Sequence, residues 1–201
     1  MKYQVFIASL LLQGTAAAAP VTGADAPDPF RQPTINYLKQ FEKPAEKIFV
    51  YERYNAAGEL TSRVVEPLKQ PVIINSVTER TFGQYTIRLR GLATCPTGNV
   101  QYEGANSKCD AAAKDYQDAI YNGRASVILC KTLLLERDRT SAEPASCFAL
   151  VGSGSKSSPN HVAYDDDAMV FMNMAVIGRN KDGKSLRPDL ERSSHLGKQF
   201  Q

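Results

Sequence analysis

Two pairs of cysteines inside one block, residues 87–150, constrain the fold of this chain more than any other feature. The block starts with the strand-like segment IRLRGL, continues through Cys95 and Cys109 into a short helical pattern, and ends between Cys130 and Cys147. An even number of cysteines, four in 201 residues, is typical of disulfide-bonded proteins of oxidising compartments. Four cysteines allow three pairings. A metal site is the weaker interpretation, because the sequence has no CxxC motif and its histidines lie far from the cysteines.

The first 18 residues have the layout of an export signal. Lys2 precedes the apolar run of residues 5–12, and Ala16 and Ala18 form the small-residue pattern of a cleavage site. We expect cleavage after Ala18 and a mature protein that is periplasmic or secreted. An uncleaved helix is the alternative, but the apolar run is too short to span a bilayer well. No later apolar stretch of the sequence reaches membrane length.

A chain of 201 residues fits one domain with a substantial core. Residues 19–33, rich in Pro, Ala and Asp, predict a flexible linker. Residues 34–69 predict an N-terminal extension, in which a short helix capped by Thr34 precedes a hairpin with strands at 48–54 and 60–65. The net charge of +3 does not by itself indicate nucleic-acid binding, which usually needs a clustered basic face.

Residues 70–201 predict the main domain. Alternation within residues 85–92 places Arg88 and Arg90 on the face opposite the apolar side chains. The three aspartates at 165–167 precede an apolar run, so we expect them to form a solvated helix start. In chain order, the patterns predict strands at 72–77 and 85–92, a polar loop at 93–108, a helix at 110–121, strands at 125–130 and 147–152 joined by a charged loop at 136–146, a helix after the aspartates, and a final polar helix at 185–200.

This order of elements resembles that of the exported staphylococcal-nuclease-like (thermonuclease) family. The supporting motifs are IRLRGL, a helix that ends at Asn122-Gly123, and the segment 138–147, which reads DRTSAEPASC where relatives often have Asp-Arg-Tyr-Gly-Arg-x-x-x-x-Cys. The resemblance covers residues 70–201. It implies a mainly β, α+β fold: a five-stranded OB-type barrel with helices packed alongside. Residues 34–69 would then be a hairpin extension of this barrel.

The resemblance also implies a catalytic site of known composition. Such a site needs carboxylates that bind Ca²⁺, a glutamate that activates water, and two arginines that bind phosphate. Arg88 occupies the first arginine position, whereas Ala142 occupies the second. The carboxylate positions fall at residues 75–76, at Ala93 and within 94–97, and none of these is acidic. A Ca²⁺ site built from Ser, Thr and Asn would lack the negative charge that provides most of the affinity.

The resulting hypothesis is an exported nuclease-like domain that has lost catalysis and acts as a binding or assembly protein in the cell envelope. We expect no metal, no cofactor and no confident catalytic residue. Arg88, Arg90 and Tyr85 would form a basic and aromatic binding face of the kind that OB barrels use. An ordinary solvated surface is the competing interpretation of these residues. The ligand would be an envelope protein, a polysaccharide, or a nucleic acid or other anionic molecule.

The alternative is an active secreted nuclease or phosphodiesterase. Arg88 would then bind the phosphate, Glu136, Asp138 and Arg139 of the charged loop would complete a relocated site, and Ca²⁺ would be the cofactor. A nuclease-like inhibitor or immunity protein is a third hypothesis.

The predicted hairpin also favours one of the three cysteine pairings. Cys130 and Cys147 lie at the start and the end of the hairpin loop, within reach across two neighbouring strands. Cys95 and Cys109 would close the long loop that precedes the helix. Each closed loop has about 15 residues, for which the chain-entropy model gives about 3 kcal/mol of stabilisation.

Overall fold

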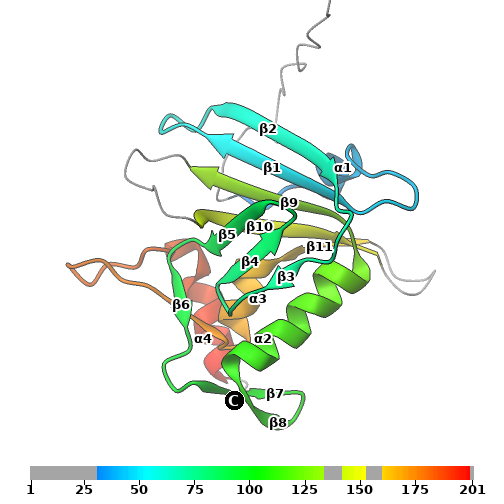
Figure 1. The fold of residues 1–201 in the computed structure, drawn as a ribbon. Helices are drawn as coiled ribbons and strands as arrows, with labels where there is room; N and C mark the ends of the chain where they lie inside the picture. Colours follow the sequence, from blue (N-terminus) through cyan, green and yellow to red (C-terminus); the bar gives the residue numbers. More distant parts are fainter. Residues whose placement is uncertain (1–30, 134–141, 153–159, 200–201) are drawn as a thin grey trace, which may run out of the picture.

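The structure, a computed structural model, describes residues 31–133, 142–152 and 160–199. The predicted export signal, most of the predicted linker, and Glu136, Asp138 and Arg139 lie outside the described residues. The fold is mixed α+β, as predicted: a large sheet dominates, and several helices pack beside it (Figure 1).

The described strands and helices follow the predicted order in most places. No helix within the described ranges is both long and apolar enough to cross a membrane. The strands are β1 (Ile48–Tyr54), β2 (Leu60–Pro67), β3 (Ile73–Ile74), β4 (Glu79–Phe82), β5 (Tyr85–Leu89), β6 (Leu92–Thr94), β7 (Asn99–Tyr102), β8 (Ala105–Lys108), β9 (Ala125–Leu133), β10 (Glu143–Val151), β11 (His161–Tyr164) and β12 (Ala175–Ile177). The helices are α1 (Ile35–Lys39), α2 (Cys109–Asp118), the π-helical turn η1 (Ala119–Arg124), α3 (Asp165–Phe171), the 3₁₀ turn η2 (Pro188–Leu190) and α4 (Glu191–Gln199).

One sheet has the strand order β2-β1-β9-β10-β5-β4-β3, with β11 added to β10. The central strands β9 and β10 are antiparallel, while β1 joins β9 and β5 joins β10 in parallel. Two small antiparallel pairs form separate two-stranded sheets: β6 with the distant β12, and the hairpin β7–β8. Among the described residues no pairing joins β3 to β2 or to β9, so this sheet has free edges.

The sheet curls so that strands far apart in its order meet face to face. The ring of Phe49 on β1 stacks on that of Phe82 on β4, with 4.8 Å between the centroids. Tyr121 of η1 packs edge-on against Phe82 at 5.4 Å. These rings belong to a buried cluster on the concave face, which also contains Ile87 and Cys130. The concave face therefore holds the main core.

The N-terminal hairpin is part of the main sheet. Thr34 caps α1 as predicted, its hydroxyl accepting a hydrogen bond from the amide of Tyr37 at 3.1 Å. Beyond the hairpin itself, β1 pairs with β9 along its whole length. Glu52 of β1 is fully buried and accepts hydrogen bonds from the hydroxyls of Tyr37 and Tyr54 and from Arg63. These bonds fix α1 against the convex face of the sheet and connect it to β1 and β2.

The two predicted disulfides are confirmed. Cys130 and Cys147 are direct partners in the β9–β10 register, with Cα atoms 4.2 Å apart. Cys95 and Cys109 have Cα atoms 6.4 Å apart and connect the segment after β6 to the first residue of α2.

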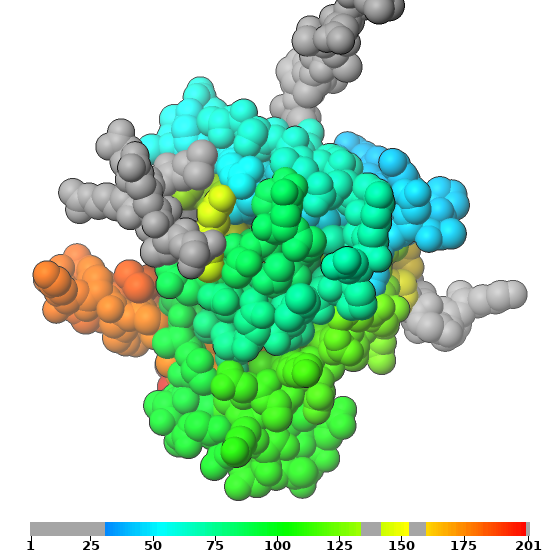
Figure 2. All heavy atoms as spheres, in the orientation of Figure 1, coloured from blue at the N-terminus to red at the C-terminus, as the bar shows by residue number. Residues whose placement is uncertain are grey.

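Several local predictions were wrong. The predicted polar loop 93–108 contains the β7–β8 hairpin, whose turn has positive φ angles at Glu103 and Gly104. This is the geometry of a type I′ turn, but Glu-Gly is not one of its usual sequence signals. The atoms of this region project at the lower end of the molecule (Figure 2). In addition, β10 starts at Glu143, inside the predicted charged loop, and the last helix, α4, starts at Glu191.

Replacing Cys130 and Cys147 by alanine should destabilise the protein more than replacing Cys95 and Cys109. Loop closure contributes about 3 kcal/mol in either case. Both pairs are buried, but Cys130 and Cys147 are 0% exposed between the two central strands, whereas Cys95 is 6% exposed, so removal of the first pair should leave the larger cavity. Urea unfolding of the two double variants and the wild type measures the difference. Equal losses would contradict this expectation.

Candidate functional site

Arg88 lies on the exposed convex face of β5, beside the turn between β3 and β4. It is paired in register with Glu79 on β4, and the amide of the next residue, Leu89, donates to the Thr78 carbonyl at 2.7 Å. The turn holds Asn75 and Ser76, the positions where the resemblance places a metal-binding aspartate. The Asn75 amide donates to Thr81 at 2.9 Å, and the Ser76 hydroxyl accepts from the Thr78 amide at 3.3 Å. Both side chains therefore serve the turn itself.

The other expected catalytic positions also lack charged side chains. Ala93 and Thr94 lie on β6 and pair with β12, and Ala142, at the second arginine position, is 4% exposed. Within residues 31–133, 142–152 and 160–199, no three His, Cys, Asp or Glu side chains converge on a point that could hold a metal ion. The described residues beside Arg88 thus do not fit the Ca²⁺ site of the resembled family.

Tyr85 lies on the face opposite Arg88, so the predicted shared binding face is not formed. Its ring contacts the rings of Phe49 and Tyr51 on the concave side, with centroids 5.6 Å and 5.5 Å away. Arg90 is half-buried beside Arg187, and burial and that neighbouring charge lower its pKa. The three residues predicted to bind a ligand therefore occupy three different environments.

The concave face carries a polar group that the sequence patterns did not predict. We call Tyr51, Arg53, Tyr85 and Glu143 the Arg53 cluster. Arg53 donates to both carboxylate oxygens of Glu143, through Nε at 3.1 Å and Nη2 at 2.9 Å, and the Tyr51 hydroxyl donates to the same carboxylate at 2.6 Å. The Arg53 guanidinium lies over the Tyr51 ring, 4.3 Å from its centroid, and 5.9 Å from that of Tyr85. The side chains of Arg53 and Glu143 remain 21% and 34% exposed.

Contacts within the cluster determine the protonation states of Arg53, Glu143 and Tyr51. Hydrogen bonds from Arg53 hold the pKa of Glu143 below its usual range, outweighing the opposing effect of burial, and the Tyr51 hydroxyl contributes further. The hydrogen bond to Glu143 raises the pKa of Arg53, and burial together with Glu143 raises that of Tyr51. At neutral pH Arg53 is therefore a cation, Glu143 an anion and Tyr51 a neutral phenol. The two hydrogen bonds from Arg53 to Glu143 use two of the five N–H groups of the guanidinium.

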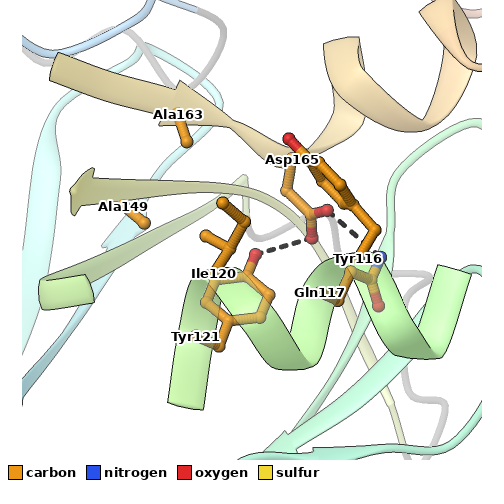
Figure 3. A pocket seen from close by; sticks show the side chains of 7 residues that line it. All are labelled: Tyr116, Gln117, Ile120, Tyr121, Ala149, Ala163 and Asp165. Atoms are coloured by element: carbon orange, nitrogen blue, oxygen red, sulfur yellow. Dashed lines mark hydrogen bonds between the residues drawn. The ribbon is translucent and has the colours of Figure 1, made fainter. Parts of the chain in front are cut away.

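The prediction of a solvated acidic helix start at 165–167 was wrong for its first two residues. Asp165 is nearly buried: Arg80 Nη2 lies 2.5 Å from its carboxylate, and the hydroxyl of Tyr121 donates to it at 2.6 Å. Gln117 also donates to it, at 3.1 Å (Figure 3). Beside these side chains is a cavity of about 10 Å³, room for roughly one water molecule. Arg80 lies two residues before the buried Phe82, so both side chains point to the same face of β4. This spacing was the sequence signal for an inward-facing arginine.

Asp166 is fully buried and forms an ion pair with a second buried arginine, Arg187. Arg187, also 0% exposed, binds the Asp166 carboxylate and donates to Asp189 at 2.8 Å and to the Arg90 carbonyl at 3.0 Å. The Ser146 hydroxyl completes the set, donating to Asp166 at 2.9 Å. Both arginine–aspartate pairs are enclosed by protein, so they connect α3 to the sheet and offer little contact to a ligand.

Acidification should destabilise the protein in part through Glu143. A carboxyl whose pKa is lowered by folding contributes stability above its unfolded pKa, and this contribution is lost as the pH falls through the folded value. Glu143→Gln should therefore lower the melting temperature by a few degrees at pH 7 and have much less effect near pH 3. Thermal unfolding across this range measures the effect. Glu191→Gln, which removes the looser surface pair with Arg179 (3.7 Å), is the control. An equal shift for Glu143→Gln at both pH values would contradict the assignment.

Comparison with known proteins finds no match. No protein-family description, curated protein or solved structure is significantly similar to this chain.

Proposed function

We propose that this chain is an exported, disulfide-stabilised binding protein of the cell envelope. Its core would be a nuclease-like, OB-type barrel whose phosphodiesterase site has been lost. The single observation that carries the proposal is the Arg53 cluster: a preorganised guanidinium–carboxylate pair beside tyrosine rings, partly exposed to solvent on the concave face.

The order of elements supports the barrel component. The meander β3–β4–β5 is followed by α2 and the antiparallel pair β9–β10, and β10 returns parallel to β5. This is the strand, helix and hairpin order that the resemblance implies. At the edge of β9 where such a barrel would close, β1 is paired instead. We infer that the N-terminal hairpin replaces the closing contact and leaves the barrel open.

The two disulfides support a location in an oxidising compartment, where such bonds form and persist. A periplasmic or secreted location also agrees with the layout of the first 18 residues.

The chemistry of the Arg53 cluster favours a neutral, hydroxyl-rich ligand such as a polysaccharide. An anionic ligand would have to compete with Glu143 for Arg53, because the two side chains already form a bidentate pair. A sugar hydroxyl, in contrast, can donate to Glu143 and accept from another N–H group of Arg53 while the pair stays intact. The partly exposed Tyr85 ring supplies an apolar surface next to these groups.

Binding to a neutral chito-oligosaccharide, compared with a single-stranded DNA oligomer, tests the proposed ligand class. We expect calorimetry to detect the sugar, and Arg53→Gln or Glu143→Gln to weaken binding about tenfold, since each substitution leaves a polar partner unpaired. Arg179→Gln is the matched control, because Arg179 also pairs with a glutamate but on another surface. Tighter binding of the DNA oligomer than of the sugar would contradict the proposal.

Loss of catalysis is tested separately by a nuclease assay with Ca²⁺ and with a chelator. We expect no chelator-sensitive cleavage of DNA or RNA, because the expected carboxylate positions hold neutral residues. Robust cleavage that disappears in Arg88→Ala would instead establish the alternative, an active secreted nuclease or phosphodiesterase that uses Arg88.

A further inference from the structure

The segment between β12 and η2 projects from the body of the protein as a hairpin-shaped arm. In Figures 1 and 2 it is the orange projection at the left margin. All six residues from 179 to 184 are exposed. We call residues 178–186 the basic arm, after its basic residues Arg179, Lys181 and Lys184.

Hydrogen bonds within the basic arm hold its shape. Its base is closed by the amide of Leu186, which donates to the Gly178 carbonyl at 2.9 Å. Nearer the tip, the amide of Asn180 donates to the Lys184 carbonyl at 2.9 Å, and its side-chain oxygen accepts from the amides of Asp182 and Lys184. None of these bonds uses a lysine ammonium group, so the lysine charges are presented to solvent by a loop that does not need them for its own fold.

The positive charge of the protein is concentrated in the part of the chain that contains this arm. Residues 175–199, from the start of β12 to the end of α4, include six basic and three acidic residues, a net charge of +3. The whole chain has the same net charge, so the rest of it is neutral on balance. The basic arm thus carries excess positive charge on a protruding surface, an arrangement that attracts an anionic surface.

Two exposed aliphatic side chains stand at the base of the basic arm. Leu186 is 47% exposed, and Val176 on β12 is 37% exposed. The strand continues past β12 to Gly178, whose amide donates to the Gly91 carbonyl at 2.8 Å, and a Cβ on Gly178 would lie 3.1 Å from Leu186 Cδ1. Leu186 therefore covers the face of the strand to which Val176, two residues before Gly178, also points. The cations of the arm are thus accompanied by an aliphatic pair on one face.

We propose that the basic arm binds the surface of an anionic lipid bilayer. Its lysines lie against the lipid phosphates, while Leu186 and Val176 enter the boundary between headgroups and acyl chains. A convex projection matches a flat bilayer, whereas a small free anion is bound where several donors converge in a concavity. A single-stranded nucleic acid is less suitable, because its bases stack on aromatic rings and residues 175–186 contain none. The proposal depends neither on the ligand of the Arg53 cluster nor on the loss of nuclease activity.

Partition of the full chain between buffer and two kinds of vesicle tests the proposal. One kind is pure phosphatidylcholine, the other is an equal mixture with phosphatidylglycerol, and the readout is the ratio of the two partition coefficients. This ratio cancels membrane binding by the predicted export signal that does not depend on lipid charge. The arm has three basic residues and one acidic residue. At roughly fivefold per net charge, we expect a ratio of roughly 30 at low salt and a ratio close to one at high salt.

The double variant Lys181→Gln, Lys184→Gln should lose this preference and give a ratio near one at low salt. The double variant Lys39→Gln, Lys43→Gln is the matched control. It removes the same charge from two exposed lysines at and just after the end of α1, on the other side of the molecule (Figure 1), and should keep the wild-type ratio. Equal losses in the two double variants, or a wild-type ratio near one at low salt, would overturn the proposal.

Leu186→Gln distinguishes a lipid surface from a nucleic acid as the partner. Loss of the aliphatic contact should lower the vesicle ratio about fivefold and leave the binding of a single-stranded DNA oligomer unchanged. Ile73→Gln is the control, because Ile73 is an exposed aliphatic residue of β3 (59%) and its replacement should not change the ratio. A wild-type ratio in Leu186→Gln, or lysine substitutions that weaken DNA binding without lowering the vesicle ratio, would contradict a bilayer as the partner.

Discussion

The pairing of β9 with β10 supports every other part of the sheet. β9 receives β1 on its outer side, and β10 receives both β5 and β11 on the other. Because β1 and β5 attach in parallel, neither can reach its place through a short turn, and each depends on a correctly registered central pair. The Cys130–Cys147 bond joins two residues that face each other directly in that pair. A slip of one residue between β9 and β10 would turn the side chains of one strand to the opposite face of the sheet.

Charged residues have two distinct roles in this molecule. Arg80 with Asp165, and Arg187 with Asp166, are enclosed pairs that hold α3 against the sheet. Removing one partner of such a pair leaves an uncompensated buried charge, so these residues are constrained by folding. Arg53 and Glu143 form an equally close pair but stay partly exposed on the concave face. Only this second kind of pair can exchange contacts with a molecule from solution, which is why we assign binding to it.

Local signals in the sequence were sufficient for much of the fold. The cap at Thr34, the β1–β2 hairpin and both disulfides depend on residues that are close along the chain or at the ends of one loop. The parallel attachment of β1 to β9 could not be predicted, because nothing in either strand specifies the distant partner. The candidate site likewise combines a feature that local sequence could predict with one that it could not. Side chains alternate between the two faces of a strand, so Tyr85 and Arg88, three residues apart, must lie on opposite faces. The sequence itself therefore argues against their shared binding face. The meeting of Arg53 with Glu143 depends on the pairing of β1 with β9 and of β9 with β10, and it has no sequence signal.

The attachment of β1 to β9 has a consequence for biosynthesis. Residues 48–54 leave the ribosome about 70 residues before the first residue of β9, an interval of several seconds at roughly 5–20 residues per second. Throughout that interval the apolar segment IFVYERY is paired on one side at most, since its second neighbour has not yet been translated. The nascent polypeptide is thus exposed to wrong partners for longer than its small size suggests, and the segment depends on being shielded until β9 has emerged.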